Sequence, residues 1–319
     1  MTHPSPIINN PFASSLFWPV VARVVILLAV ALVAVVAVER KPWHELKQTA
    51  LFKRVRSWAV IAPVFMIAVF VGGIVGLAIV GYLAAQALGE YGRLVGLRRS
   101  YAWLLAGSGV LTLALVGYLS RWFLFAPLAF FVLVTLVPIV TQHVEHAHYQ
   151  VTSSLFGFIY IPFCLSYLVY IRTVEVPGVQ LLLLIGFSVA LSDVCAYVVG
   201  NIAGGPKLAP VVSPNKTWSG AVGNVAGAYL GLAVMWFALP PRWSVTTVII
   251  VPLVLGIACL FGDLIESFVK RDFGVKDAGD LLPGFGGLLD RIDSLLIAAP
   301  FGYYAVILTQ NFSVGPGTG

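Results

Sequence analysis

Long apolar runs separated by short polar segments make up most of this chain. Each run has the roughly 17 to 25 residues that an α-helix needs to cross the hydrocarbon core of a bilayer. The runs cover residues 16–38, 101–119, 122–140, 155–171, 179–199, 221–239, 245–264 and 292–308. This pattern predicts an all-α, polytopic helical bundle embedded in a membrane.

A further apolar stretch, residues 58–88, is too long for one span and short for two. Gly72 and Gly73 lie in its middle, so we predict a tight helical hairpin that is broken at these glycines. The total is then nine or ten transmembrane helices. We divide the chain into N-terminal membrane helices with a basic cytoplasmic segment, residues 1–100, and a membrane-embedded region, residues 101–319.

Composition supports a membrane protein. The chain is 60% hydrophobic and only 10% charged, which is too little charge to cover the surface of a soluble protein of this size. Its beginning lacks the basic region of a cleaved signal peptide, so we expect the first apolar run to be retained. The three cysteines all fall inside apolar runs without paired spacing, which favours small buried residues over disulfides or a metal site.

The basic residues predict the orientation. If the N-terminus lies outside, the loops at residues 39–57, 89–100, 141–153, 200–219 and 265–291 are cytoplasmic. These loops carry fifteen of the nineteen Lys and Arg residues, as the positive-inside rule requires. We therefore expect a multi-pass protein of the cell's inner (cytoplasmic) membrane. The net charge of +6 is explained by anionic membrane lipids, and we expect no nucleic-acid partner.

Two polar segments have simple structural explanations. Residues 39–58 combine apolar positions at helical spacing with six basic residues, which fits either a basic amphipathic helix on the inner leaflet or a charge cluster that sets topology. His143, Glu145, His146 and His148 do not have the spacing of a zinc site. A solvated loop is favoured there over a metal site.

The acidic residues are concentrated in one segment. Six of the seven aspartates lie within residues 261–294, between two apolar runs. Carboxylates at a bilayer edge are costly, so they normally have a partner or a task. Alternating acids and bases around a Gly-Pro loop suit a divalent cation and a polyphosphate. A salt-bridged cytoplasmic loop is the alternative.

Within this segment, two helix ends are expected to meet. Asp263 and Glu266 would close one helix, and Asp290 and Asp293, three residues apart, would open the next. Their carboxylates could surround one or two Mg²⁺ ions. Residues placed to neutralise or approach phosphates are Lys270, Arg271, Lys276, Gly284, Gly286 and Gly287.

An upstream pair of clusters could contribute to the same site. Asp193 is an acid inside an apolar run, so it should face a polar cavity or a cation, or else form a structural hydrogen bond to a neighbouring helix. Residues 213–217 (Ser-Pro-Asn-Lys-Thr) precede a helix that Thr217 or Ser219 could cap; Lys216 and the free N–H groups could bind phosphate. A plain capped turn is the alternative. Glycines at 220, 223, 227 and 231 predict a close helix–helix contact.

These motifs resemble a known family. The segments 267–271 (SFVKR), 276–277 (KD) and 282–293 (LPGFGGLLDRID), with Asp193, Ala196 and Tyr197 and with residues 213–220, are similar to the signature of the phosphatidate cytidylyltransferases, or CDP-diacylglycerol synthases. The similarity is specific from about residue 185 to 300. It identifies residues 101–319 as the cytidylyltransferase catalytic region.

The resemblance implies an enzyme that transfers CMP from CTP to phosphatidate and releases CDP-diacylglycerol and pyrophosphate. By that likeness, the metal ligands are Asp263, Asp290 and Asp293, and Lys270 and Arg271 are catalytic. Substrate contacts are expected from Asp193, Tyr197, Ser213, Pro214, Lys216, Thr217, Lys276, Asp277, Gly286, Gly287 and Arg291. We expect Mg²⁺ as cofactor, bilayer lipids around the site, a site that faces the cytoplasm, and a homodimer.

Two departures from the family pattern are visible. The family usually has His at the position of Phe285 and Glu at that of Ser219, so the chain could be a specialised paralogue. Alternative functions are a CTP-dependent lipid kinase of the polyprenol or phytol type, and a catalytically impaired lipid-binding or transport protein. A transporter should show inverted repeats, and we find none in the sequence.

Overall fold

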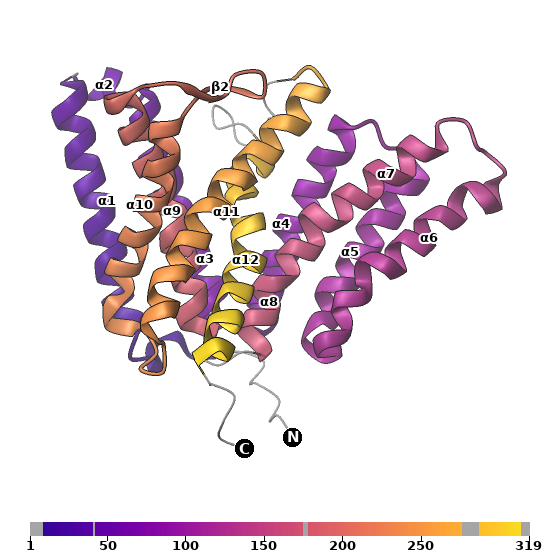
Figure 1. Cartoon of the computed structure of the whole chain (residues 1–319), viewed down its shortest axis with the longest axis horizontal. Coiled ribbons are helices and arrows are strands. Elements are labelled where there is room, and N and C mark those ends of the chain that lie inside the picture. Colours follow the sequence, from indigo (N-terminus) through magenta and orange to yellow (C-terminus); the bar gives the residue numbers. More distant parts are fainter. Residues whose placement is uncertain (1–8, 41, 175–177, 276–286, 314–319) are drawn as a thin grey trace. The chain divides into compact units, whose positions relative to one another are not determined.

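The computed structural model describes residues 9–40, 42–174, 178–275 and 287–313 (Figure 1). Ten helical spans in this part of the chain are long and apolar enough to cross a membrane, which confirms an all-α polytopic bundle. Five of the helices in the described residues contribute no side chain to the candidate site: η1 (Pro11–Ala13), α5 (Arg99–Leu119), η2 (Ser120–Phe125), α6 (Ala126–Thr141) and η4 (Trp236–Ala238).

The chain forms two compact units, Met1–Ile79 and Val80–Gly319. This boundary lies within α4, whereas our division by function after residue 100 stays a prediction. The first unit contains α1 (Phe17–Glu39), α2 (Trp43–Leu46), α3 (Ala50–Val71) and the start of α4 (Gly73–Leu94). Helix α3 ends at Gly72, whose φ of 57° favours glycine. The predicted break at Gly72 and Gly73 is confirmed.

The basic segment after α1 is not one continuous helix. Helix α2 has only four residues, and the Thr49 side chain accepts a hydrogen bond from the N–H of Phe52 to start α3. The second half of residues 39–58 is therefore the first part of α3. The single amphipathic helix expected here is wrong, because a capping threonine divides the apolar pattern.

In the second unit, α9 (Gly178–Ala203) and α10 (Trp218–Met235) pack closely. A Cβ atom on Gly223 would come within 2.6 Å of the Cys195 carbonyl oxygen, and one on Gly231 within 2.7 Å of the Ser188 backbone. The Ser192 hydroxyl donates to the Asn224 carbonyl at 2.8 Å. These contacts confirm the close approach predicted from the glycine spacing.

Helix α10 also contacts α11 (Val245–Asp272), and α11 packs against α12 (Leu289–Ser313) (Figure 1). The two cross at Gly262, where an added Cβ would lie 2.7 Å from the Cα of Ser294. The Ser294 hydroxyl donates to the Cys259 carbonyl at 3.1 Å. This crossing brings two acidic helix segments side by side.

Two further elements border the α11–α12 crossing. A short antiparallel hairpin, β1 (Lys207–Ala209) and β2 (Ser213–Thr217), connects α9 to α10; no strand was predicted there. On another side, α7 (Ala147–Phe158) continues through the π-helical segment η3 (Ile159–Phe163) into α8 (Cys164–Val174). The Tyr160 hydroxyl donates to the Gly262 carbonyl at 3.2 Å, so η3 contacts the crossing directly.

Candidate active site

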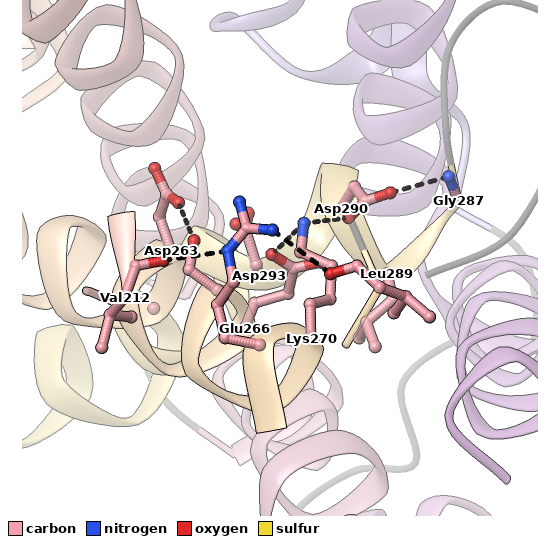
Figure 2. Close-up of polar contacts among 12 residues, drawn as sticks. Val212, Asp263, Glu266, Lys270, Gly287, Leu289, Asp290 and Asp293 are labelled. Atoms are coloured by element: carbon pink, nitrogen blue, oxygen red, sulfur yellow. Dashed lines mark hydrogen bonds and ion pairs between the residues drawn. The ribbon is translucent and has the colours of Figure 1, made fainter. Parts of the chain in front are cut away.

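Three carboxylates meet where α11 crosses α12. One ligand oxygen each from Asp263, Glu266 and Asp293 lies within 4.8 Å of the other two. Figure 2 labels the three side chains and shows them near one another. Asp263 and Glu266 are one helical turn apart on α11, and Asp293 is in the first turns of α12. We call these three residues the carboxylate group.

Two lysines neutralise part of this charge. Lys270 Nζ lies 2.6 Å from Glu266 Oε2 and 2.7 Å from Asp290 Oδ1, and so links α11 to α12 (Figure 2). Lys216 Nζ, on β2, lies 2.5 Å from Asp263 Oδ2. Lys270 and Glu266 are 14% and 2% exposed, so little water screens that ion pair. Lys216 is 18% exposed but its partner Asp263 is 41% exposed, so water screens that pair more strongly.

The balance of charge favours a cation. When ionised, Asp263, Glu266, Asp290 and Asp293 carry two more charges than Lys216 and Lys270, the lysines that pair with three of them. The side chain of Glu266 is 2% exposed, and its Oε1 has no hydrogen-bond partner among the described residues. An unpaired buried carboxylate oxygen is costly. A divalent cation with oxygen ligands would supply both the charge and the contact.

Asp290 lies beside the carboxylate group without being one of its members. Its Oδ1 faces Lys270, and its Oδ2 accepts a hydrogen bond from the N–H of Gly287 at 2.8 Å (Figure 2). The predicted metal ligands were Asp263, Asp290 and Asp293. The structure brings Asp263 and Asp293 together with Glu266, and the role of Asp290 as a metal ligand stays a prediction.

The acidic residues of α11 do not end their helix. Helix α11 runs to Asp272, nine residues beyond Asp263. It continues because Val269 is buried and because Lys270, one turn after Glu266, pairs with that glutamate. The expectation that two helix ends meet is therefore wrong for α11, which contributes its carboxylates from within the helix.

Other predicted residues occupy several places around the group. Asp193 is exposed on α9, and Tyr197, one turn later on the same helix, is 37% exposed. Arg271 donates to the backbone carbonyls of Val212 and Val275, so it links α11 to the loop between β1 and β2. Arg291 is partly buried in the first turn of α12.

The polar segment before α10 is a strand followed by a capped helix start. Ser213 and Pro214 begin β2, and the Thr217 hydroxyl accepts a hydrogen bond from the N–H of Gly220 at 3.1 Å. Capping by Thr217 is thus confirmed. The Ser219 hydroxyl donates to the Gly204 carbonyl. Predicted residues outside the described part of the chain are Lys276, Asp277, Gly284, Phe285 and Gly286.

Sequence reasoning missed two residues that border the site. Both oxygens of Glu90 accept hydrogen bonds from the start of α12, and Tyr160 reaches Gly262 beside Asp263. An acid at the end of an apolar run was the available signal for Glu90; Tyr160 had none. The histidine cluster lies elsewhere, with His143, His146 and His148 exposed.

The fold and the site together define a multi-pass membrane protein with clustered carboxylates and lysines. A family model described as the cytidylyltransferase family matches residues 52–309, and the chain belongs to this family. That confirms the resemblance found in its motifs.

Individual relatives match over different lengths. A phosphatidate cytidylyltransferase of Brucella suis biovar 1 (strain 1330) is 45% identical over 149 residues, 46% of this chain and 54% of the relative. A phosphatidate cytidylyltransferase of Staphylococcus haemolyticus (strain JCSC1435) is 36% identical over 156 residues, which are 47% of this chain and 60% of the relative. The uncharacterized protein YnbB of Escherichia coli (strain K12) is 33% identical over 261 residues, which are 79% of this chain and 86% of the relative. The chain spans about half the length of the Brucella relatives.

Proposed function

We propose that this protein transfers CMP from CTP to phosphatidate, with release of CDP-diacylglycerol and pyrophosphate. The family membership and the names of two of its relatives support a cytidylyltransferase. The observation that carries the proposal is the carboxylate group, held beside Lys216 and Lys270 at a close crossing of two membrane helices. Binding a nucleoside triphosphate for transfer requires this combination of cation ligands and basic side chains.

The residues fit one or two Mg²⁺ ions. Asp263, Glu266 and Asp293 offer the hard oxygen ligands that Mg²⁺ prefers, and Asp290 is the further ligand expected from the sequence. When bound, the ion would neutralise phosphate oxygens and polarise the reacting phosphorus. The carboxylates would then no longer need both lysines as partners.

The chain's own residues would bind and neutralise the phosphates. Lys270 would face the phosphates of CTP, while Lys216 and Ser213 on β2 would contact the second substrate or the leaving pyrophosphate. An oxygen of the phosphatidate phosphate attacks the α-phosphorus, and the bond to the β-phosphate oxygen breaks in line with it. This chemistry requires positioning and charge neutralisation but no covalent enzyme intermediate.

We further propose that the site faces the cytoplasm, where CTP is found. The distribution of basic residues among the loops supports this orientation. A homodimer in the inner membrane stays a prediction from the sequence.

Labelled CTP provides the test. Purified protein in phosphatidate-containing vesicles is incubated with Mg²⁺ and with CTP labelled at either the α- or the γ-phosphate. We expect the α-label in the lipid fraction and free labelled pyrophosphate from the γ-label. Transfer of the γ-label to lipid would instead identify a lipid kinase. If neither label reaches lipid, a catalytically impaired lipid-binding protein is indicated.

A further inference from the structure

Glu90 is a fully buried carboxylate on α4, outside the acidic segment. Its exposed fraction is 0%. One oxygen accepts a hydrogen bond from the N–H of Leu288 and the other from the N–H of Leu289, each at 2.9 Å. A charged group is buried only where such partners repay its lost hydration. The single side chain therefore connects α4 to a segment almost 200 residues later in the chain.

The partners of Glu90 are the amides at which α12 begins. The first N–H groups of a helix have no partner within the helix, and the positive end of the helix dipole lies there. A carboxylate that accepts hydrogen bonds from two of these N–H groups forms strong, charge-assisted interactions. Asp290 follows immediately and Asp293 lies one turn further. Glu90 thus holds the helical turn that carries both aspartates.

Helix α4 is itself fixed close to Glu90. The hydroxyl of the next residue, Tyr91, donates to the Ser153 carbonyl of α7 at 2.7 Å. The Tyr149 hydroxyl donates to the Val95 carbonyl at 2.7 Å, and the buried Gln150 bonds both Gly96 and Arg98. The end of α4 and the residues that follow it are therefore hydrogen-bonded to α7, and Glu90 joins the same helix to α12.

We propose that Glu90 is a positioning residue for the transfer reaction, a role that rests on the proposed function. It fixes the first turn of α12, so that Asp293 stays in the carboxylate group and Asp290 stays opposite Lys270. Glu90 does not touch these aspartates itself; it acts through the backbone amides of Leu288 and Leu289. A shift of about 1 Å in such a turn is enough to impair catalysis strongly.

Two replacements of Glu90 separate its charge from its length. Glu90→Gln keeps the size, but its amide NH₂ would face one of the two N–H donors. Glu90→Asp keeps the charge but draws the oxygens back by one methylene. Tyr91→Phe is the matched control on the same helix, because it breaks the bond to α7 without touching α12. Glu145→Gln, on an exposed turn, controls for loss of one negative charge.

The full-length protein is purified in detergent, and four experiments are carried out on each variant. The four experiments are thermal unfolding with and without Mg²⁺, a Mg²⁺ titration for the half-saturating concentration, steady-state kinetics for kcat and the KM of CTP, and hydrogen exchange in the peptide starting at Gly287. For Glu90→Gln we expect faster exchange at Leu288 and Leu289, weaker stabilisation by Mg²⁺, and kcat lowered about 10- to 100-fold. Glu90→Asp should recover part of each.

For Tyr91→Phe we expect a lower thermal midpoint with the wild-type Mg²⁺ requirement, and Glu145→Gln should match wild type throughout. The proposal is overturned if Glu90→Gln keeps the wild-type exchange, Mg²⁺ response and kcat. It is equally overturned if Glu90→Gln merely lowers the midpoint as Tyr91→Phe does. Should Glu90→Gln fail to fold, the same criteria apply to Glu90→Asp.

The exchange and Mg²⁺-stabilisation measurements need no turnover. If wild-type protein makes no CDP-diacylglycerol, the proposed function fails. Loss of amide protection and of Mg²⁺ stabilisation in Glu90→Gln would then still support its positioning of α12, and their retention would still refute it.

Discussion

Two helix crossings in the second unit are packed in the same way but have different side chains around them. In each, a glycine removes the side chain at the contact: Gly231 against Ser188 between α9 and α10, and Gly262 against Ser294 between α11 and α12. In each, a serine hydroxyl donates to a backbone carbonyl across the contact. Small residues and such hydrogen bonds are what hold helices together where there is no water to expel.

The crossings differ in what lies next to the glycine. The contact between α9 and α10 is lined by small and neutral residues, including the buried Ser188, Ser192 and Asn224. Beside Gly262, by contrast, come Asp263 and Asp293, with Glu266 one turn away. The glycine at each crossing allows the two backbones to come close, while the neighbouring side chains make the second crossing acidic, which is why we propose that it binds a cation.

The largest effect should come from removing one charge at the acidic crossing. Asp293→Asn takes away a member of the carboxylate group, so we expect CDP-diacylglycerol formation to fall about 10²- to 10³-fold with the protein still folded. Turnover at saturating CTP and Mg²⁺ measures this. Asp272→Asn, an exposed acid at the end of the same α11, is the control. Equal activity of the two variants would contradict a cation site here.

A smaller effect distinguishes the two glycines. Gly231→Ala and Gly262→Ala each push a methyl group into backbone, and each should lower the free energy of unfolding by about 1–3 kcal/mol. Because Gly262 adjoins Asp263, only Gly262→Ala should also raise the half-saturating Mg²⁺ concentration. Chemical denaturation in detergent and Mg²⁺ titration of turnover check this. If both variants shift the Mg²⁺ requirement alike, the crossings do not differ as described.

The smallest effect is expected at the far end of α11. The Ser244 side chain accepts a hydrogen bond from the N–H of Thr247 at 3.2 Å and caps the helix. Ser244→Ala should therefore cost about 1 kcal/mol of stability and leave the Mg²⁺ requirement unchanged, whereas Ser244→Asn should retain the cap. A changed requirement in Ser244→Ala would mean that the acidic crossing depends on the whole helix rather than on its local contacts.

The class of protein and the position of the acidic segment could be predicted from the order of residues alone. Apolar length and charge are properties of consecutive residues, so nine or ten spans, the break at Gly72 and the acidic segment could all be recognised locally. The glycine spacing of α10 likewise predicted a close contact, because positions three and four apart share one helix face. The order of residues along the chain was enough to predict these features.

Which of these residues meet could not be predicted from their order along the chain. Asp263, Glu266 and Asp293 form one group while Asp290 pairs with Lys270, and Glu90 contacts the start of α12, almost 200 residues later in the chain. Sequence spacing fixes the face of a helix but not the height and angle at which two helices cross. Those depend on the contact at Gly262, on Lys270 and on Glu90 together, so the geometry of the site follows from packing between distant segments.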